Sequence, residues 1–391
     1  MSGVLLYGGS FNPPHLGHVS ALRAAAEQLS PERVLVIPAS IPPHKDIPVG
    51  SPSADERLEL TRLAFSSIPG AEVSDIELRR EGKSYTVDTL REIGALYPGE
   101  ELYFLVGTDM LLYIENWYEF RSVLSLCTLC VLAREEGETE TIREFAERLT
   151  ALYGARIEII PAKPFPMSST AVREALPRRE GREALPPDVY AEIIRRRYYG
   201  AKPELNWLRE RTDECLKPRR ILHVRGCEET ARRLAERWGE DADDAAEAGI
   251  LHDITKRLDG EEQLRLCEKY GIVLTKAERR DASTLHARTG AHYARERFGV
   301  SDRVFSAIEW HTTGREDMTT LEKIVYLADF IEPNRAFPGV DDVRALALED
   351  LDAALVLAME MGLESLKKRG IVPLERTETA LISLRQRMNR K

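Results

Sequence analysis

The sequence predicts two domains: an α/β domain built on a doubly wound parallel sheet, followed by an all-α domain. In the first half, apolar runs typical of strands alternate with amphipathic helical patterns, an order that indicates parallel strands with helices on both faces. After about Gly200, helical patterns follow one another without a convincing strand. The chain of 391 residues exceeds the roughly 100–200 residues of an ordinary domain, so each half can bury its own core.

The first half is expected to contain parallel strands separated by helices. The apolar runs that predict strands lie at 4–8, 34–39, 102–107, 127–133 and 157–162. The helical patterns between them lie at 15–29, 85–97 and 141–154. Because the strand runs are apolar on both alternating faces, we expect helices to cover both faces of a Rossmann-like sheet.

The second half carries apolar residues at helical spacing. The clearest stretches are 229–238, 244–258, 320–333 and 348–370. Gly200 and Pro203 separate two helical patterns, which places the junction at about 199–203. The expected domains are therefore 1–199 and 205–391.

Composition and charge narrow the class of protein. The formal net charge of -10 argues against a general nucleic-acid binder, which needs a basic surface. The sequence has no apolar run long enough to cross a bilayer, and its start lacks the basic segment of a signal peptide. We expect a soluble cytoplasmic protein without nucleic-acid or membrane partners, and both a monomer and a homo-oligomer stay open.

Cysteine usage does not indicate a disulfide framework, because the count of five is odd and spread over both halves. Cys127 and Cys130 form a C-x-x-C pattern inside an apolar run. Strand alternation would point their sulfurs to opposite faces, which disfavours a redox or zinc site.

A glycine-rich segment, GGSFNPPHLGH at 8–18, connects the first expected strand to a helix. Glycines let the backbone approach a ligand closely. His15 and His18 fall near the helix N-terminus, where unpaired amides favour anions, and both imidazoles could donate to a phosphoryl group. The loop residues expected to border the phosphates are Gly8, Gly9, Ser10 and Phe11.

A second anion site is expected at MSSTAVR, residues 167–173. Three hydroxyl residues stand where they can cap a helix, and an arginine follows one turn later. These residues are Ser168, Ser169, Thr170 and Arg173. Two anion sites suit a triphosphate, whereas a lone glycine-rich turn would be compatible with an ordinary strand-loop-helix connection.

Together these two segments resemble the H-x-G-H nucleotidyltransferases, which transfer an adenylyl group from ATP and release pyrophosphate. Further segments, IPASIPPHK, SYTVDTL, LVGTDM and NWYEF, resemble nicotinate-nucleotide adenylyltransferase. The resemblance implies Mg²⁺ bound with ATP and a set of residues for nicotinate mononucleotide. Those residues are Lys45, Thr86, Asp109, Trp117, Tyr118 and Arg134.

One detail of this resemblance departs from the family pattern. After Arg134 the family more often has a proline, which is absent here. A sister H-x-G-H transferase that acts on phosphopantetheine or nicotinamide mononucleotide is the alternative. The PPHK, GTD and NWY segments favour the acid, nicotinate mononucleotide.

The helical half contains a set of histidines and aspartates in or beside apolar patterns, where uncompensated polarity is costly. The set consists of His223, His252, Asp253, His286, His311 and Asp329. Helices can bring such distant residues to one metal centre. For any single member, a satisfied histidine or a capping aspartate is the more common case, but the whole set favours a metal site.

The order of this set resembles the HD-domain phosphohydrolases. The segments ILHDITK, TLHARTGA, WHTTGRE and YLADFIEPNRAFPGV look like the YqeK-type HD hydrolases, which cleave diadenosine tetraphosphate symmetrically to ADP. The resemblance implies one metal held by His223, His252, Asp253 and Asp329, and a second held by His286 and His311 and bridged by Asp253. It implies iron, with manganese as the alternative.

Three cations are expected to bind phosphates at this site: Lys256, Arg315 and Arg335. The alternative for this half is a nucleotide-sensing or oligomerisation module without turnover. The complete ligand set favours an enzyme.

Overall fold

The computed structural model describes residues 3–42, 47–133, 136–161, 165 and 167–389. The chain divides into two compact units, Met1–Lys202 and Pro203–Lys391. The division falls inside the segment 199–203 that the sequence indicated. No helix among the described residues is long and apolar enough to cross a membrane.

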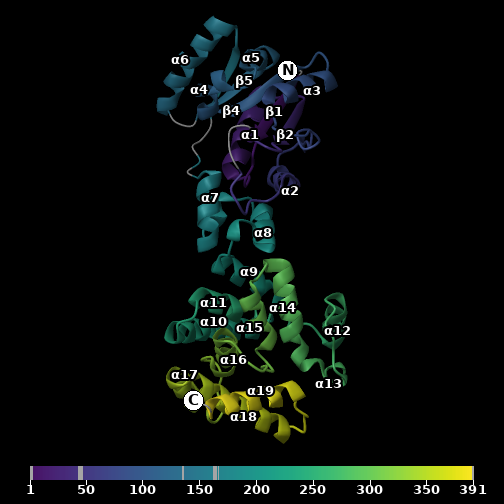
Figure 1. Ribbon diagram of the computed structural model, residues 1–391, viewed down its shortest axis with the longest axis vertical. Helices are drawn as coiled ribbons and strands as arrows, with labels where there is room; N and C mark the ends of the chain where they lie inside the picture. Colours follow the sequence, from purple (N-terminus) through teal and green to yellow (C-terminus); the bar gives the residue numbers. More distant parts are fainter. Residues whose placement is uncertain (1–2, 43–46, 134–135, 162–164, 166, 390–391) are drawn as a thin grey trace. The chain divides into compact units, whose positions relative to one another are not determined.

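The first unit is built on a parallel sheet, of which β1, β2, β4 and β5 are labelled in Figure 1. Its strand order is β3-β2-β1-β4-β5-β6. The strands are β1 Gly3–Gly9, β2 Arg33–Pro38, β3 Ala71–Val73, β4 Glu101–Gly107, β5 Thr128–Ala133 and β6 Arg156–Pro161. The predicted doubly wound fold is confirmed. Only β3 was not predicted, because three residues at a sheet edge are too short for a pattern.

Helices connect these strands. They are α1 Leu16–Leu29, α2 Ala54–Phe65, α3 Thr86–Leu96, α4 Thr108–Leu112, α5 Phe120–Leu126, α6 Glu136–Tyr153, α7 Ser169–Ala175 and α8 Pro187–Arg196. Short 3-10 turns lie at Ile114–Asn116, Leu176–Arg178, Arg182–Ala184 and Tyr198–Gly200.

Alternation along the strands builds a core on each face of the sheet. Val4 and Leu6 of β1 belong to the core formed with α3, α5 and α6. Between them, Leu5 and Tyr7 alternate to the other face, where the Tyr7 ring meets Phe65 of α2 at a centroid distance of 6.2 Å. The continuous apolar runs of the sequence are explained by this burial on both faces.

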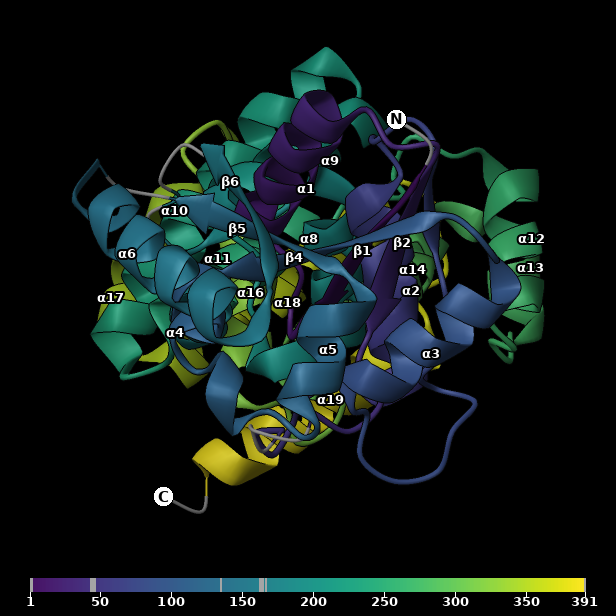
Figure 2. The same cartoon turned by 90° about the horizontal axis from the view of Figure 1, so that it is seen from above.

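The strand order reverses between β1 and β4, which lie side by side in Figure 2. In doubly wound sheets, the loops that follow the carboxyl ends of strands at such a point form the ligand crevice. The glycine-rich segment follows β1, the GTD segment follows β4, and residues 165–173 come after β6. The fold therefore collects at one edge the segments that the sequence singled out.

The two C-x-x-C cysteines are buried beside β5. Cys127 belongs, with Leu129 and Val131, to the core that faces α3 and α5, and Cys130 alternates to the other side. Both are free thiols whose pKa burial raises to about 12. They show no sign of the activation that a redox pair needs.

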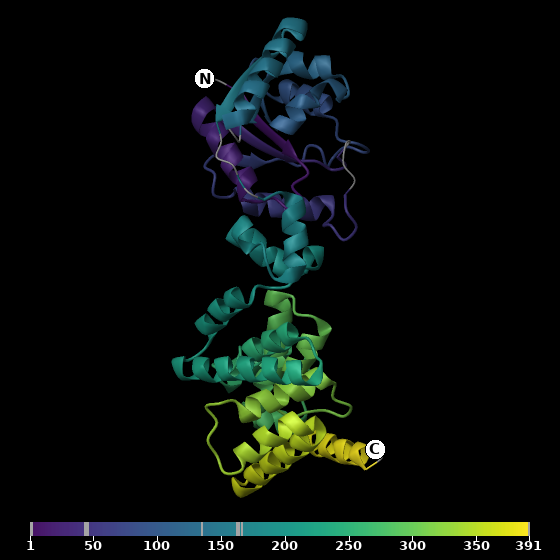
Figure 3. The same ribbon diagram turned by 90° about the vertical axis from the view of Figure 1, so that its left-hand side faces the viewer.

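The described part of the second unit contains only helices (Figure 3), as predicted. They are α9 Leu205–Cys215, α10 Pro218–Trp238, α11 Ala242–Leu251, α12 Gly260–Lys269, α13 Lys276–Arg280, α14 Leu285–Phe298, α15 Asp302–Trp310, α16 Thr320–Ile331, α17 Val340–Glu349, α18 Leu351–Lys368 and α19 Glu375–Met388, with a 3-10 turn at Ala282–Thr284. Helix α10 packs against α11 and α16, and α14 packs against α15.

Two predicted helices end differently from their sequence patterns. Helix α11 ends at Leu251 and the chain turns over 252–258. The stretch 348–370 is divided at Asp350, whose carboxylate accepts the N–H groups of Asp352 and Ala353, each at 3.0 Å. An N-cap of this kind starts a new helix even where the apolar pattern is continuous.

Candidate functional sites

The two histidines of the glycine-rich segment are held by the start of α1. His15 is the N-cap, and its Nδ1 accepts the Gly17 N–H at 3.1 Å. Nδ1 of His18 accepts the main-chain N–H of His15, also at 3.1 Å. Since a nitrogen that accepts carries no proton, the neutral ring of each histidine has its proton on Nε2. Both rings are therefore donors at Nε2, and their centroids lie 3.8 Å apart.

Aromatic side chains fix these rings in place. Phe165 stacks on His15 with an interplanar angle of 9°. Phe11 meets His18 edge to face and is only 1% exposed. A Cβ at Gly17 would lie 2.9 Å from the His15 ring, so a glycine is needed between the histidines. Phe11 thus supports His18 from the core.

Arg57 of α2 was missed by the sequence reasoning. Its guanidinium is 1% exposed and donates to the carbonyls of Ser10 at 2.7 Å, Ala39 at 2.8 Å and Ser40 at 2.8 Å. It therefore ties together the loops that follow β1 and β2. The one signal in the sequence is that Arg57 falls on the face of the helix that carries the apolar residues, where a cation is unusual.

The segment 168–173 lies directly against the glycine-rich loop. Ser168 caps α7 and accepts the Ala171 N–H at 3.2 Å, while the Ser169 hydroxyl donates to the Pro13 carbonyl at 2.9 Å. Arg173 donates to the Asn12 carbonyl at 2.6 Å and to the Thr170 hydroxyl at 3.1 Å. The structure therefore brings both predicted anion-binding segments together.

The residues expected around a mononucleotide are more dispersed. Thr86 opens α3 and Asp109 lies in α4 directly after β4. Trp117 packs on the core ring of Phe104. Tyr118 is 54% exposed, and its ring lies 4.7 Å from that of Tyr85, a neighbour that the sequence did not single out. Two further predicted residues, Lys45 and Arg134, lie outside the described residues.

In the second unit, five helices or their ends bring the predicted set together. His223 lies inside α10, His286 and Asp329 lie in α14 and α16, and the others follow the ends of α11 and α15. Nε2 of His223 lies 3.2 Å from Nε2 of His252 and 3.1 Å from Oδ1 of Asp329. All four histidines are buried.

Asp253 lies at the middle of this set and is fully buried. Its Oδ2 is 3.4 Å from Nε2 of His252 and 3.7 Å from Nε2 of His223. Its Oδ1 is 3.3 Å from Nε2 of His286 and 3.9 Å from Nε2 of His311. Each carboxylate oxygen therefore faces a different pair of histidines.

Polar atoms inside the cluster fit a bound cation. Asp253 Oδ1 and His311 Nε2 are buried without a hydrogen-bond partner, which is costly unless a ligand satisfies them. Burial, aided by the charge of His252, lowers the pKa of His311 to about 4. Burial and the Lys256 charge hold the pKa of His286 well below its ordinary value. Neutral imidazole is the form that binds metals, and this applies to these two rings. Burial also disfavours the charged form of His223, but its interactions with Asp329 and Cys227 together outweigh burial and raise the pKa of His223 to about 9.

Three residues of this site were missed by the sequence reasoning. Cys227 lies one turn after His223, with its sulfur 3.4 Å from Nε2 of His223. Arg220 lies one turn before it and forms an ion pair with Asp253. Their helical spacing from His223 could have revealed both. The third is Glu332, whose Oε1 is hydrogen-bonded to Nδ1 of His223.

The three predicted phosphate-binding cations differ in their surroundings. Nζ of Lys256 lies 3.1 Å from both ring nitrogens of His286, and Arg335 lies 2.7 Å from Oδ1 of Asp329. Arg315 instead pairs with the fully buried Glu322 at 2.9 Å. Lys256 and Arg335 therefore lie beside the histidine cluster, and Arg315 does not contact it through this ion pair.

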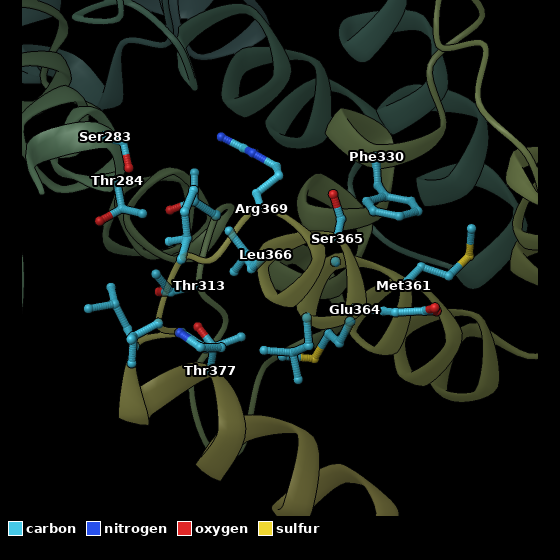
Figure 4. Close-up of a pocket in the computed structure, with 18 of the residues that line it drawn as sticks. Ser283, Thr284, Thr313, Phe330, Met361, Glu364, Ser365, Leu366, Arg369 and Thr377 are labelled. Carbon is cyan, nitrogen blue, oxygen red and sulfur yellow. The ribbon is translucent and has the colours of Figure 1, made fainter.

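A cavity of about 630 Å³ opens beside the cluster and reaches His311 and Asp329. Figure 4 shows Phe330, Met361 and Arg369 among the side chains around it. Its walls combine apolar and aromatic groups with hydroxyls, a mixture typical of sites for small organic ligands.

Comparisons with known proteins agree with this division of the chain. The cytidylyltransferase-like family model matches residues 6–175, and the HD domain model matches residues 220–334. Probable nicotinate-nucleotide adenylyltransferases from Carboxydothermus hydrogenoformans and Gloeobacter violaceus are each 35% identical over 195 residues. These alignments cover 50% and 49% of this chain, and 96% and 93% of the relatives.

Among solved structures, a predicted HD superfamily hydrolase involved in NAD metabolism from Clostridium acetobutylicum is 35% identical, with a TM-score of 0.47. It covers 49% of this chain and 100% of its own. With its first half aligned to nearly the whole length of the curated relatives, the chain belongs to the nicotinate-nucleotide adenylyltransferase family, and it carries an HD domain in its second half.

Proposed function

We propose that the chain carries two nucleotide-processing activities. The first unit transfers the adenylyl group of ATP to nicotinate mononucleotide, an assignment supported by 35% identity over nearly the full length of a probable nicotinate-nucleotide adenylyltransferase. The second unit hydrolyses diadenosine tetraphosphate to two molecules of ADP. The observation that carries this second assignment is the position of Asp253 between two pairs of histidines.

In the first unit, a phosphate oxygen of nicotinate mononucleotide attacks the α-phosphorus of ATP. The bond from that phosphorus to the bridging oxygen breaks, which yields deamido-NAD and pyrophosphate. Nε2–H of His15 and His18 hydrogen-bonds the phosphoryl oxygens as charge develops on them. Mg²⁺ bound with ATP supplies further charge neutralisation. The residues held against the loop, Ser169 and Arg173, border the triphosphate.

The remaining first-unit assignments concern the mononucleotide. The exposed ring of Tyr118 offers a face for stacking on the pyridine. Thr86 and Trp117 bind the pyridine ring and its carboxylate together with Tyr118. Asp109 lies directly after β4, at the crevice, and also contacts the mononucleotide. By family resemblance, Lys45 binds the mononucleotide phosphate and Arg134 contacts the mononucleotide; both lie outside the described residues.

In the second unit, the six predicted ligands would hold two divalent metals, iron or manganese, which when bound would supply charge neutralisation and an activated water. His223, His252 and Asp329 would hold one metal and His286 and His311 the other, and Asp253, which faces both histidine pairs, would contribute to each. Water adds to one of the two central phosphorus atoms, and the bond from that phosphorus to the central bridging oxygen breaks. Each product is then ADP.

The surrounding residues bind the substrate. Lys256 and Arg335 stand beside the ligands and provide positive charge for the tetraphosphate. The adjoining cavity accepts one nucleoside, with Phe330 and Met361 offering apolar contacts for the base. Arg315 has its charge already balanced by Glu322, so its contribution is the smallest of the three cations.

A substrate panel tests the two assignments together. The native chain and the variants His18→Ala and Asp253→Ala are assayed for formation of deamido-NAD and for release of ADP from diadenosine tetraphosphate. We expect each variant to lose one activity and keep the other. Loss of the same activity in both variants would contradict the two-site assignment. A purified chain that binds divalent metal yet leaves diadenosine tetraphosphate intact would favour the sensor module instead.

A further inference from the structure

Each histidine of the cluster uses Nδ1 for a hydrogen bond to an oxygen and turns Nε2 toward the other ligands. Three of them use a main-chain carbonyl three residues earlier: His252 with Gly249 at 2.7 Å, His286 with Ser283 at 2.9 Å, and His311 with Ile308 at 2.7 Å. His223 instead has the Glu332 carboxylate at 3.1 Å. We propose that Glu332 is a positioning residue that orients His223 for metal binding.

The position of His223 explains why it needs an acceptor from another element. It lies in the interior of α10, where the main-chain carbonyls accept N–H groups of the same helix. His252 and His311 are the C-caps of α11 and α15, and His286 is the second residue of α14. At helix ends a local carbonyl lacks an intrahelical partner and can accept from a side chain, whereas inside α10 each carbonyl already accepts a main-chain N–H.

Glu332 is held firmly enough to orient a ring. It follows the end of α16 and is 1% exposed. Its Oε2 accepts the main-chain N–H of Asn334 at 2.7 Å and the Asn334 side-chain amide at 2.8 Å. The same amide donates to the Leu222 carbonyl at 3.2 Å. Oε1 is thereby directed at Nδ1 of His223.

Gly226 provides the space for this carboxylate. A Cβ at this position would lie 2.4 Å from Oε2 of Glu332 and 3.2 Å from its Cβ. Glycine inside a helix normally lowers stability relative to alanine, so its presence in the middle of α10 is otherwise unexplained. The close approach of Glu332 gives it a reason.

The expected consequence is chemical as well as geometric. A carboxylate on Nδ1–H fixes the tautomer with its lone pair on Nε2 and makes that nitrogen a stronger ligand. Removal of such a partner typically weakens metal binding by about 10–100-fold. The inference rests on the metal centre of the proposed function, but it does not depend on which substrate the centre cleaves.

Binding of Co²⁺ to the full chain tests the inference, with dissociation constants from chelator competition and visible absorption as the report on the ligand geometry. We expect Glu332→Leu to weaken Co²⁺ binding by about 10–100-fold and to change the absorption bands. Glu332→Gln keeps an acceptor oxygen and should lose less. Gly226→Ala displaces the Glu332 carboxylate without altering it and should behave like Glu332→Leu. It replaces Glu332→Leu in the test if Glu332→Leu does not fold.

Glu228→Gln is the matched control, since Glu228 is a buried carboxylate on α10 that pairs with Arg209. It should leave Co²⁺ affinity unchanged. Native affinity and spectrum in both Glu332→Leu and Gly226→Ala would overturn the inference, as would an equal loss in Glu228→Gln. A native chain that binds no Co²⁺ would overturn both the inference and the metal centre. Co²⁺ binding without release of ADP would contradict only the proposed hydrolase.

Discussion

His18 uses its two ring nitrogens for different purposes, and two amide substitutions separate them. Nδ1 accepts the His15 N–H at 3.1 Å, and Nε2–H is proposed to stabilise the phosphoryl group. His18→Asn places an amide oxygen near the position of Nδ1 and leaves nothing at Nε2. His18→Gln places an amide near Nε2 and leaves the His15 N–H without its acceptor.

The expected magnitudes follow from these contacts. Loss of one preorganised donor to a transition-state charge costs about 10²–10³ in kcat, or about 2.7–4 kcal/mol. Loss of a helix cap costs only about 1 kcal/mol of folding stability. A domain stable by about 5 kcal/mol would stay more than about 99% folded after that loss. Unfolding therefore cannot imitate the loss of rate.

We therefore expect His18→Asn to lose about 10²–10³ in kcat for deamido-NAD formation with little change in the free energy of unfolding. His18→Gln should keep more of the rate and lose more stability. The assays are initial rates with ATP and nicotinate mononucleotide, and urea denaturation. Ser53→Ala, which removes the cap of α2, is the control for stability alone. Equal rates in both His18 variants would refute this division of roles.

Three further predictions concern the second unit. Asp253→Asn should lower hydrolysis of diadenosine tetraphosphate by at least about 100-fold and leave deamido-NAD formation within about twofold; parallel loss would contradict separate sites. Chelation of metal should lower the free energy of unfolding by about 2.7 kcal/mol relative to protein at a metal concentration of 100 times Kd, and an unchanged melting temperature with EDTA would count against bound metal. Burial lowers the pKa of His292 below 6.5, and the charges of Arg295 and Arg288 lower it further. The neutral His292 ring therefore contributes fully to stability above pH 6.5, and this contribution is lost as the pH falls toward the folded-state pKa. His292→Phe should flatten that part of the curve of unfolding free energy against pH, measured by urea denaturation.

Local pattern was sufficient for most of the fold. The apolar runs that became β1, β2, β4 and β5 are apolar on both faces, which is typical of parallel strands covered on both sides, whereas β6 at the sheet edge is mostly exposed or half-buried. The glycine-rich segment was predicted between a strand and a helix, and it connects β1 to α1. Short β3 and the division at Asp350 were not visible, because one depends on its neighbour β2 and the other on a single cap.

The sequence by itself determined which residue types could carry the chemistry: two histidines at a helix start, and four histidines with two aspartates in apolar helices. Only the tertiary structure decided how they meet. Periodicity says which face of a helix is buried, but not which other element it contacts. The two-sided placement of Asp253, the Glu332 carboxylate on His223 and the space at Gly226 all arise between elements distant in sequence. Such contacts depend on packing in three dimensions, which no local pattern contains.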